Sequence, residues 1–304
     1  MANSTATLIK TRSIIDYQPA FREAADKDPW DWKAVTKEMT TKRGEERFFA
    51  YVGYPMPDQV NELQSIPFVD MAELGETKLN IVKFGMGGRF SFEIVEDNQH
   101  LPELLGESGK MLGEAFAQFV AKYQSYVFDR AFTTNSAYYV FDIQPLCGTH
   151  TLNDGSTYVN ALGALGADYD NFWLSKAAYE WQRKNHVGLL ATDTVDAVVA
   201  YSTYLPTWTK ILTNPYQPDT TDRNENFVAK DKIKLVINPY QYSATQWSLC
   251  GKKFREKNIM LWRKRMKVDA PFEDKTLRAW LIPAEMRFIT KPIDYLSIQS
   301  ATGA

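Results

Sequence analysis

The chain has few of the residues on which metal, redox and acid–base chemistry usually depend. Its 304 residues include two cysteines and three histidines. Cys147 and Cys250 lie far apart and in neither a metal-binding nor a redox spacing, which is typical of a reducing compartment. Cys147 and His150 would make half of a metal site at most, with no second pair to complete it. We therefore expect no metal and no cofactor.

The sequence also lacks a long hydrophobic run and an excess of charge of one sign. No apolar run approaches the ~18 residues of a membrane helix, and the first residues, MANSTATLIKTR, lack a signal-peptide core. Lysine and arginine (35) nearly balance aspartate and glutamate (37), so net charge does not predict a polyanion-binding protein. These features predict a soluble cytoplasmic protein with no membrane contact.

Apolar and aromatic residues are abundant, at 44% and 13% of the chain. The longest periodic stretch is 96–132, where apolar residues recur at steps of three and four, as on one face of an α-helix. Such a helix would be roughly 50 Å long. Gly106, Gly109 and Gly113 weaken its first half by about 1 kcal/mol each, so packing from outside must hold it. The residues that we expect in the core of this spine helix are Leu105, Leu112, Phe116, Phe119 and Tyr123.

A hairpin is predicted just before this helix, over residues 77–95. Apolar residues alternate on both sides of Gly85-Met86-Gly87-Gly88, which is a strong turn signal. A two-stranded hairpin is marginal in water, so it needs a partner surface. A glycine-rich phosphate loop fits less well, since position 90 is Phe where the motif needs Gly. The residues predicted to form this intersubunit loop are Gly85, Gly87, Gly88, Arg89, Phe90 and Phe92.

The rest of the chain predicts an α+β fold without βαβ alternation or repeats. Residues 1–50 have little apolar content of their own. They form either an arm that lies on another surface or a frayed terminus with a helix near residues 31–39. Residues 168–184 read as a second amphipathic helix, and the C-terminal part is rich in strands.

A basic run lies at residues 252–267, with eight positive charges against the single carboxylate of Glu256. Phosphate or intersubunit contacts are one interpretation. Salt bridges to acidic neighbours, or a solvated face, are the other. The candidate contact residues are Lys252, Lys253, Arg255, Arg263, Lys264 and Arg265.

The order of these pieces resembles the tailed-phage major capsid protein with the Hong Kong 97-type fold. An arm, a glycine-tipped hairpin, a long helix, a polar loop, an α/β lobe and a returning β segment follow one another over about residues 60–300. Local stretches at 149–160, 168–184, 234–249 and 261–274 are similar to the Mu-like major head subunit group in particular.

The resemblance implies an α+β capsid fold with an N-terminal arm, an extended hairpin loop, a long spine helix, and peripheral and axial domains. The hairpin would reach over a neighbouring subunit, and the axial domain would meet its copies at five-fold and six-fold centres. The expected boundaries are 1–60 (N-terminal arm), 61–95 (extended loop), 96–164 (peripheral domain with the spine helix), 165–258 (axial domain) and 259–304 (return to the peripheral domain).

The implied function is a major head protein whose pentamers and hexamers build an icosahedral shell around double-stranded DNA, in a virion assembled in the bacterial cytoplasm. A portal, a scaffolding protein and a decoration protein are the other expected partners. No built-in scaffolding helix is visible, so the scaffold should be a separate protein. An encapsulin-like nanocompartment shell is the alternative. An enzyme fits less well, because no nucleophile elbow, metal set or phosphate loop is present. A nucleic-acid-binding module would rest on the basic run alone.

Overall fold

The computed structural model describes residues 2–57, 59–61, 64–97, 100–134, 138–218, 224–241 and 243–303. Its helices, with short 3₁₀ and π segments marked η, are α1 (Ala2–Arg12), η1 (Ser13–Tyr17), α2 (Gln18–Ala25), η2 (Trp32–Ala34), α3 (Phe92–Asp97), α4 (Leu101–Asp129), α5 (Tyr169–Trp181), η4 (Ser202–Tyr204), α6 (Leu205–Thr213), η5 (Val228–Asp231) and α7 (Phe254–Lys257). Its strands are β1 (Lys37–Thr40), β2 (Glu45–Tyr51), β3 (Glu73–Asn80), β4 (Val82–Ser91), β5 (Thr149–Thr151), β6 (Thr157–Val159), β7 (Val195–Ala200), β8 (Lys234–Ile237), β9 (Trp247–Gly251), β10 (Asn258–Val268), β11 (Phe272–Asp274), β12 (Ala279–Pro292) and β13 (Ile298–Ala301).

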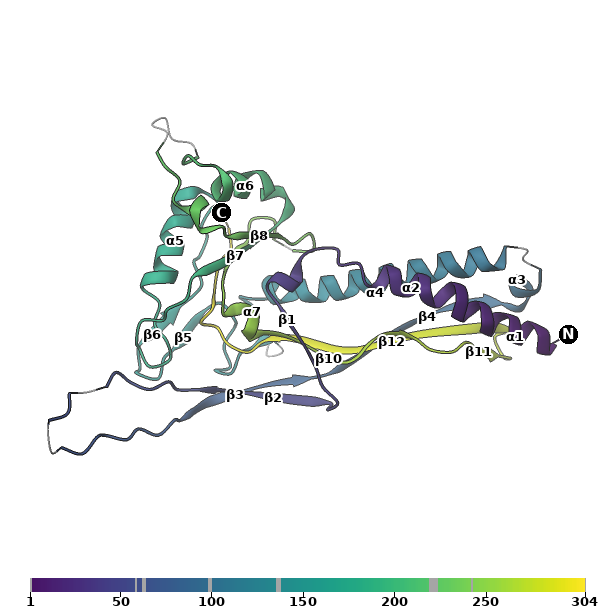
Figure 1. Ribbon diagram of the computed structural model, residues 1–304, viewed down its shortest axis with the longest axis horizontal. Helices are drawn as coiled ribbons and strands as arrows, with labels where there is room; N and C mark the ends of the chain where they lie inside the picture. The colour runs from purple at the N-terminus through teal and green to yellow at the C-terminus, as the bar shows by residue number, and fades with distance from the viewer. Residues whose placement is uncertain are drawn as a thin grey trace.

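A long helix on a long sheet forms one half of the molecule, and a second sheet with its helices forms a lobe at one end (Figure 1). The first sheet has the order β1-β10-β12-β11, and β4 pairs with β12. β1 is parallel to β10, whereas β4, β10 and β11 are antiparallel to β12. The second sheet has the order β13-β9-β7-β8. β5 and β6 form a small hairpin, and β2 and β3 form a ribbon that extends away from the body.

The final strand joins the second sheet rather than the sheet beneath the long helix. Residues 259–304 were expected to return to the domain of the spine helix, and β10 to β12 do so. However, β13 pairs with β9 from Ile298–Cys250 to Ala301–Trp247, so the chain ends in the second sheet. The four residues of β13 are all buried and carry no alternation, so their pattern gives no sign of which sheet they join.

The predicted spine helix is confirmed as α4, with narrower bounds than 96–132 because the short helix α3 precedes it. Pro102 lies in its first turn, where the missing N–H costs no hydrogen bond. Leu105, Leu112 and Phe116 are buried. Phe119 is 39% exposed, so its assignment to the core is wrong. Tyr123 is partly buried and packs against the core. The ring centroids of Phe119 and Tyr123 lie 6.5 Å and 5.1 Å, respectively, from that of Phe288, which is fully buried on β12.

The N-terminal residues lie on this helix in the same chain. The rings of Phe21 and Phe116 are 5.5 Å apart, and the Trp30 indole donates to the carbonyl of Ala121 at 3.1 Å. The interpretation of an arm that lies on another surface therefore holds, but that surface is its own α4. The alternative of a helix near residues 31–39 is wrong, because η2 and then β1 occupy this segment.

Two glycines of α4 allow this close packing. A Cβ at Gly109 would lie 2.5 Å from the Tyr17 carbonyl oxygen, and one at Gly113 would lie 2.4 Å from that of Phe21. A Cβ at Gly106 would meet nothing within 4 Å. The helix propensity lost at positions 109 and 113 is therefore offset by the docking of η1 and α2.

This difference gives a matched pair of substitutions. We expect Gly106→Ala to raise the free energy of unfolding by about 0.5–1 kcal/mol through helix propensity. Gly113→Ala should lower it by about 1–3 kcal/mol, because the methyl group forces α2 away. Urea denaturation of both variants measures the two signs, and equal effects would contradict the packing role of Gly113.

The predicted hairpin over residues 77–95 is wrong in its pairing. β3 pairs with β2, from Asn80–Glu45 to Glu73–Tyr51, and β4 pairs with β12. Residues 85–88 lie in the middle of β4 opposite residues 282–285, and none of these glycines has a positive φ. A Cβ at Gly87 would lie 2.7 Å from the Ile282 carbonyl oxygen, so this glycine permits close strand approach rather than a turn.

Candidate interaction surfaces

The β2–β3 ribbon carries an apolar segment that has little contact with its own chain. The described residues of the connection between β2 and β3, 52–57, 59–61 and 64–72, extend beyond the body (Figure 1). Phe68 is 96% exposed. The other large apolar side chains exposed along this segment are Tyr54, Met56, Ile66, Val69 and Met71. A contiguous exposed surface of this kind is typical of a site that another molecule covers.

The ribbon is also acidic. Residues 48–77 include five carboxylates and no lysine or arginine. At its base, Arg47 pairs with Glu45 at 2.8 Å and with Glu76 at 3.4 Å, and Lys78 pairs with Glu76 at 2.8 Å. The hydrogen bond from Lys78 is the main cause that lowers the Glu76 pKa below its usual value. The base of the ribbon is thus neutralised, while the far end keeps its negative charge.

An apolar groove of about 400 Å³ lies between α4 and the strands β4 and β12. Within it, the ring centroids of Phe84 and Phe119 are 4.8 Å apart, and Phe84 also packs on Phe288 at 5.2 Å. Met86 is 52% exposed. The groove is lined by Lys83, Phe84, Gly85, Met86, Ala115, Phe116, Phe119 and Met286.

The residues that were predicted for an intersubunit loop therefore occupy β4 and its continuation. Phe90 is buried, with its ring edge-on to Tyr17 at 6.4 Å. Phe92 begins α3 and lies 6.4 Å from the Trp280 ring. Gly85, Gly87 and Arg89 are exposed. The glycine-rich pattern at residues 85–88 marks part of strand β4. It did not show that the projecting ribbon, β2–β3, lies earlier in the chain.

The basic run divides between two places. Arg263, Lys264 and Arg265 lie on β10, where Lys264 binds Glu285 at 2.5 Å and Arg265 binds Glu38 at 2.6 Å. Lys252, Lys253 and Arg255 lie at the corner of β9 and α7, and all three are exposed. Salt bridges to acidic neighbours thus describe Lys264 and Arg265, while the corner residues stay candidates for contacts with another molecule.

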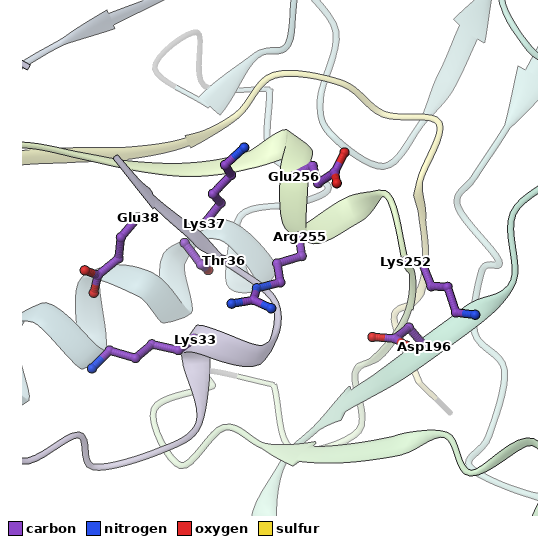
Figure 2. A pocket seen from close by; sticks show the side chains of 8 residues that line it. All are labelled: Lys33, Thr36, Lys37, Glu38, Asp196, Lys252, Arg255 and Glu256. Carbon is purple, nitrogen blue, oxygen red and sulfur yellow. The ribbon is translucent and has the colours of Figure 1, made fainter. Parts of the chain in front are cut away.

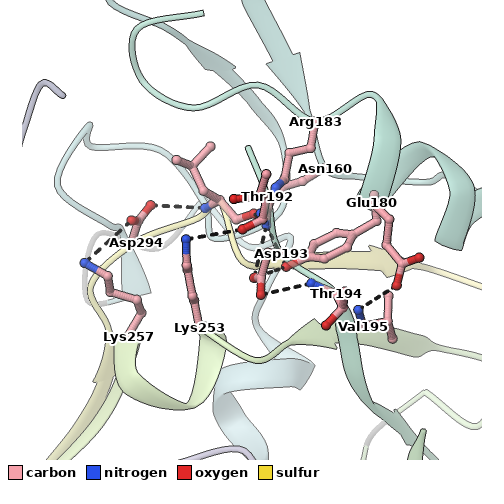
Figure 3. Close-up of polar contacts among 12 residues, drawn as sticks. Asn160, Glu180, Arg183, Thr192, Asp193, Thr194, Val195, Lys253, Lys257 and Asp294 are labelled. Atoms are coloured by element: carbon pink, nitrogen blue, oxygen red, sulfur yellow. Dashed lines mark hydrogen bonds and ion pairs between the residues drawn. The ribbon is translucent and has the colours of Figure 1, made fainter. Parts of the chain in front are cut away.

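The corner residues open onto a cavity of about 610 Å³ between the N-terminal segment, β7 and α7 (Figure 2). Its charges are mixed. Lys252 and Arg255 face it together with Asp196 and Glu256, and Lys33 is bound to Asp28 at 2.5 Å. Beside it, Lys253 donates to the Thr192 carbonyl at 3.3 Å, and Lys257 lies 4.0 Å from Asp294 (Figure 3). This alternation of signs does not form a dedicated phosphate site.

The polar loop before the lobe has a structural role. The Asn160 side chain donates to the carbonyls of Leu146 at 2.8 Å and Tyr295 at 3.0 Å, and it accepts from the Gly148 N–H at 2.7 Å. His150 is fully buried, stacks on Tyr295 at 3.7 Å, and contacts Asp142 at 2.6 Å. The resemblance in this loop therefore marks residues that join β5 and β6 to the C-terminal segment.

One carboxylate connects three strands of the first sheet. Glu285 on β12 accepts hydrogen bonds from Lys264 on β10 and from Lys83 on β4. The bond from Lys264, followed by that from Lys83, lowers the Glu285 pKa from 4.5 to about 2. Because the pKa of Glu285 is lower in the folded protein than its ordinary value, the ionised carboxylate stabilises the fold at pH values above that ordinary pKa. This stabilisation is lost as the pH falls towards 2.

We therefore expect Glu285→Gln to lower stability at neutral pH and to flatten its decline between about pH 5 and pH 2. Urea denaturation at several pH values measures both effects. Glu273→Gln, on the neighbouring strand β11, removes an exposed carboxylate of the same charge and serves as the control. An unchanged acid dependence in Glu285→Gln would contradict the role of this carboxylate.

In the described part of the chain, no group of three or more His, Cys, Asp or Glu side chains is placed to hold a metal ion. Among the same residues, no helix combines the length and apolar character needed to cross a membrane.

The architecture has clear counterparts among solved structures, although no protein-family model and no curated protein sequence matches the chain. A chain of Microbacterium phage Oxtober96 is similar at a TM-score of 0.60, with 11% identity over 90% of this chain and 91% of the other. The capsid of an empty GTA particle is similar at 0.56, with 10% identity over 89% and 88%. A virus-like particle from Pyrococcus furiosus is similar at 0.54, with 7% identity over 93% and 96%.

The chain has the Hong Kong 97-type capsid fold. The predicted α+β fold class is thereby confirmed over about nine-tenths of the chain. The element that projects from the body is the β2–β3 ribbon and not the hairpin that was predicted over residues 77–95. The Mu-like subgroup and the peripheral and axial domain boundaries stay predictions.

Proposed function

We propose that this protein is the major capsid protein of a tailed bacteriophage. Its copies would form pentamers and hexamers of a closed icosahedral shell around double-stranded DNA. The observation that carries the proposal is the β2–β3 ribbon, which leaves large apolar side chains such as Phe68 outside the body of its own chain. The capsid fold supports the same conclusion.

An apolar segment of this kind is unfavourable in water. Burial of apolar surface contributes about 25 cal/mol per Å², so covering the ribbon in an assembly is favourable. Large permanent interfaces exceed ~2,000 Å², and a projecting segment provides such area without enlarging the body. A ribbon at one end and its receptor elsewhere make a head-to-tail contact, which closes into rings.

The proposal includes partners and a place of assembly. The role is structural and not enzymatic. A portal, a separate scaffolding protein and a decoration protein would complete the particle, which would be assembled in the host cytoplasm. The exposed corner residues Lys252, Lys253 and Arg255 would meet DNA phosphates or other subunits without sequence specificity.

A nanocompartment shell is the second candidate, because the fold is equally that of the Pyrococcus furiosus virus-like particle. The two candidates differ in their contents. A phage head holds nuclease-resistant DNA when its portal and packaging proteins are present, whereas a nanocompartment encloses a protein cargo.

The test is light scattering and electron microscopy of the protein, expressed alone and with the neighbouring genes of its locus. We expect icosahedral particles of megadalton mass. A monomer or dimer that persists with scaffolding protein and crowding agent present would overturn the proposal. Particles that enclose a protein and never DNA would support the second candidate.

A further inference from the structure

The root of the β2–β3 ribbon is supported at two places within its own subunit. At the first, the fully buried Leu79 side chain of β3 packs with Ile259 and Leu261 of β10, on the first sheet. The second lies further out, at Gly75 of β3 and at Gly53, two residues after β2. Beyond these glycines, most of the described residues of the connection are exposed. The contacts at the second place therefore determine the direction in which the ribbon leaves the body.

These two glycines lie against two loops beside the lobe. A Cβ at Gly75 would lie 2.9 Å from the carbonyl oxygen of Phe141, which belongs to the loop between α4 and β5. A Cβ at Gly53 would lie 3.4 Å from a methyl group of Val187, in the loop between α5 and β7. The ribbon runs below this end of the lobe in Figure 1. We call the contacts Gly75–Phe141 and Gly53–Val187 the ribbon seat.

The two loops of the ribbon seat share one set of rings. The buried Phe141 ring stacks on Tyr295 at 5.4 Å and meets the His186 ring edge-on at 5.3 Å. His186 directly precedes Val187, and its ring lies 5.5 Å from that of Tyr295. Tyr295 belongs to the connection from β12 to β13, which joins the first sheet to the second. The position of the ribbon seat is thus tied to the place where the two sheets meet.

The turn after Phe141 is held in a strained conformation. Ile143 has a φ of 61°, which is unusual for a β-branched residue, and its side chain is 72% exposed. Asp142 contacts the fully buried His150 ring at 2.6 Å and accepts a hydrogen bond from the Gln144 N–H at 3.2 Å. A strained residue persists only where its surroundings fix it, and such residues mark positions that serve a function.

β3 also changes its register at the ribbon seat. Gly75 pairs with Ala50, but the next pair is Glu73 with Tyr51, so Leu74 is an extra residue of the kind that forms a β-bulge. A bulge bends its strand and redirects the residues that follow. The bend and the contact with Phe141 therefore act at the same point of the ribbon.

The spacing of the two supports gives the ribbon leverage. Gly75 lies about 13 Å from Leu79 along an extended chain, whereas Phe68 lies up to about 23 Å beyond Gly75. A displacement at Gly75 is therefore enlarged up to about three-fold at Phe68.

We propose that the lobe directs the ribbon through the ribbon seat, with Phe141 and Val187 as positioning residues. A shift of the lobe relative to the first sheet would then swing the ribbon about Leu79, as a hinge does. This inference goes beyond the proposed function, because it concerns a single subunit and does not depend on what a shell encloses.

Pulsed electron paramagnetic resonance on the unassembled subunit measures the direction of the ribbon. Phe68→Cys and Leu174→Cys place nitroxide labels at exposed positions of the ribbon and of α5, while the native Cys147 and Cys250 are buried. We expect a narrow distribution of distances in the doubly labelled parent, because the ribbon seat fixes the ribbon against the lobe.

Three variants of this labelled chain test the ribbon seat. Gly75→Ala should shift the mean distance by roughly 1–3 Å, because its methyl group needs about 0.5–1 Å more room beside the Phe141 carbonyl. Gly53→Ala is the matched control and should leave the distance unchanged, because its methyl group would meet Val187 at an ordinary contact distance. Phe141→Leu should broaden the distribution, because it removes the ring that stacks on Tyr295 and keeps the site apolar.

The outcomes separate this inference from the proposed function. A parent distribution as broad as that of Phe141→Leu, or equal mean distances in Gly75→Ala and Gly53→Ala, would overturn the ribbon seat. Urea denaturation shows whether each variant is folded, and if Gly75→Ala is not, the comparison of Phe141→Leu with the parent decides. A parent chain that never forms particles would overturn the proposed shell and leave this inference standing.

Discussion

A chain whose residues 53–71 are replaced by Asn-Gly should fold normally and fail to form particles. The replacement joins Val52 to Ala72, whose backbone N–H and C=O are already hydrogen-bonded at 2.9 Å, through a two-residue turn suited to a hairpin. The described residues of the removed segment are mostly exposed, so we expect the free energy of unfolding to change by less than about 1 kcal/mol. All of the apolar surface that we assign to intersubunit contact is lost.

The measurement pairs urea denaturation with light scattering on the same preparation. A control that replaces residues 275–277, in the turn between β11 and β12, with a glycine-containing turn changes another exposed loop and should leave assembly unchanged. If the shortened ribbon assembles as well as the parent, the segment belongs to no intersubunit contact. If it fails to fold, the ribbon is needed by its own subunit.

The long helix could be predicted because its signal is local. A stripe at steps of three and four over a long segment is diagnostic of a helix, and neither the three glycines nor the late start at Leu101 removes it. The same pattern predicted the burial of individual side chains less well. Phe119 has the same spacing as Phe116, but it faces the groove rather than the N-terminal helices.

Strand pairing could not be predicted in the same way. Alternation near Leu79 and Phe90 correctly marks two strands, but alternation does not identify the partner of either one. Gly87 resembles a turn residue in sequence, whereas in the fold it lies opposite Pro283. The ion pair of Arg265 with Glu38 spans 227 residues, so the basic run could not be separated into paired and free cations without the fold.

Phe116→Ala should destabilise the subunit by about 3–5 kcal/mol, a large share of the roughly 5–15 kcal/mol that a domain possesses. Phe116 is buried on the face of α4 that receives α2, and its ring packs edge-on against Phe21. The cavity would lie between α2 and α4, beside the Phe21 ring. Because Gly113 already brings α2 close to α4, we expect the N-terminal helices to loosen first.

Phe119→Ala is the matched control, since it removes the same ring one turn away on the same helix. Phe119 is partly exposed in the groove, so its loss should cost only about 1–2 kcal/mol. Urea denaturation measures both free energies, and hydrogen exchange over residues 7–25 reports whether the N-terminal helices open. Equal costs for the two variants would contradict the separation of α4 into a buried face and a groove face. If the separation holds, Phe119→Ala should leave a stable subunit, whereas Phe116→Ala should reduce the amount of folded subunit available to assemble.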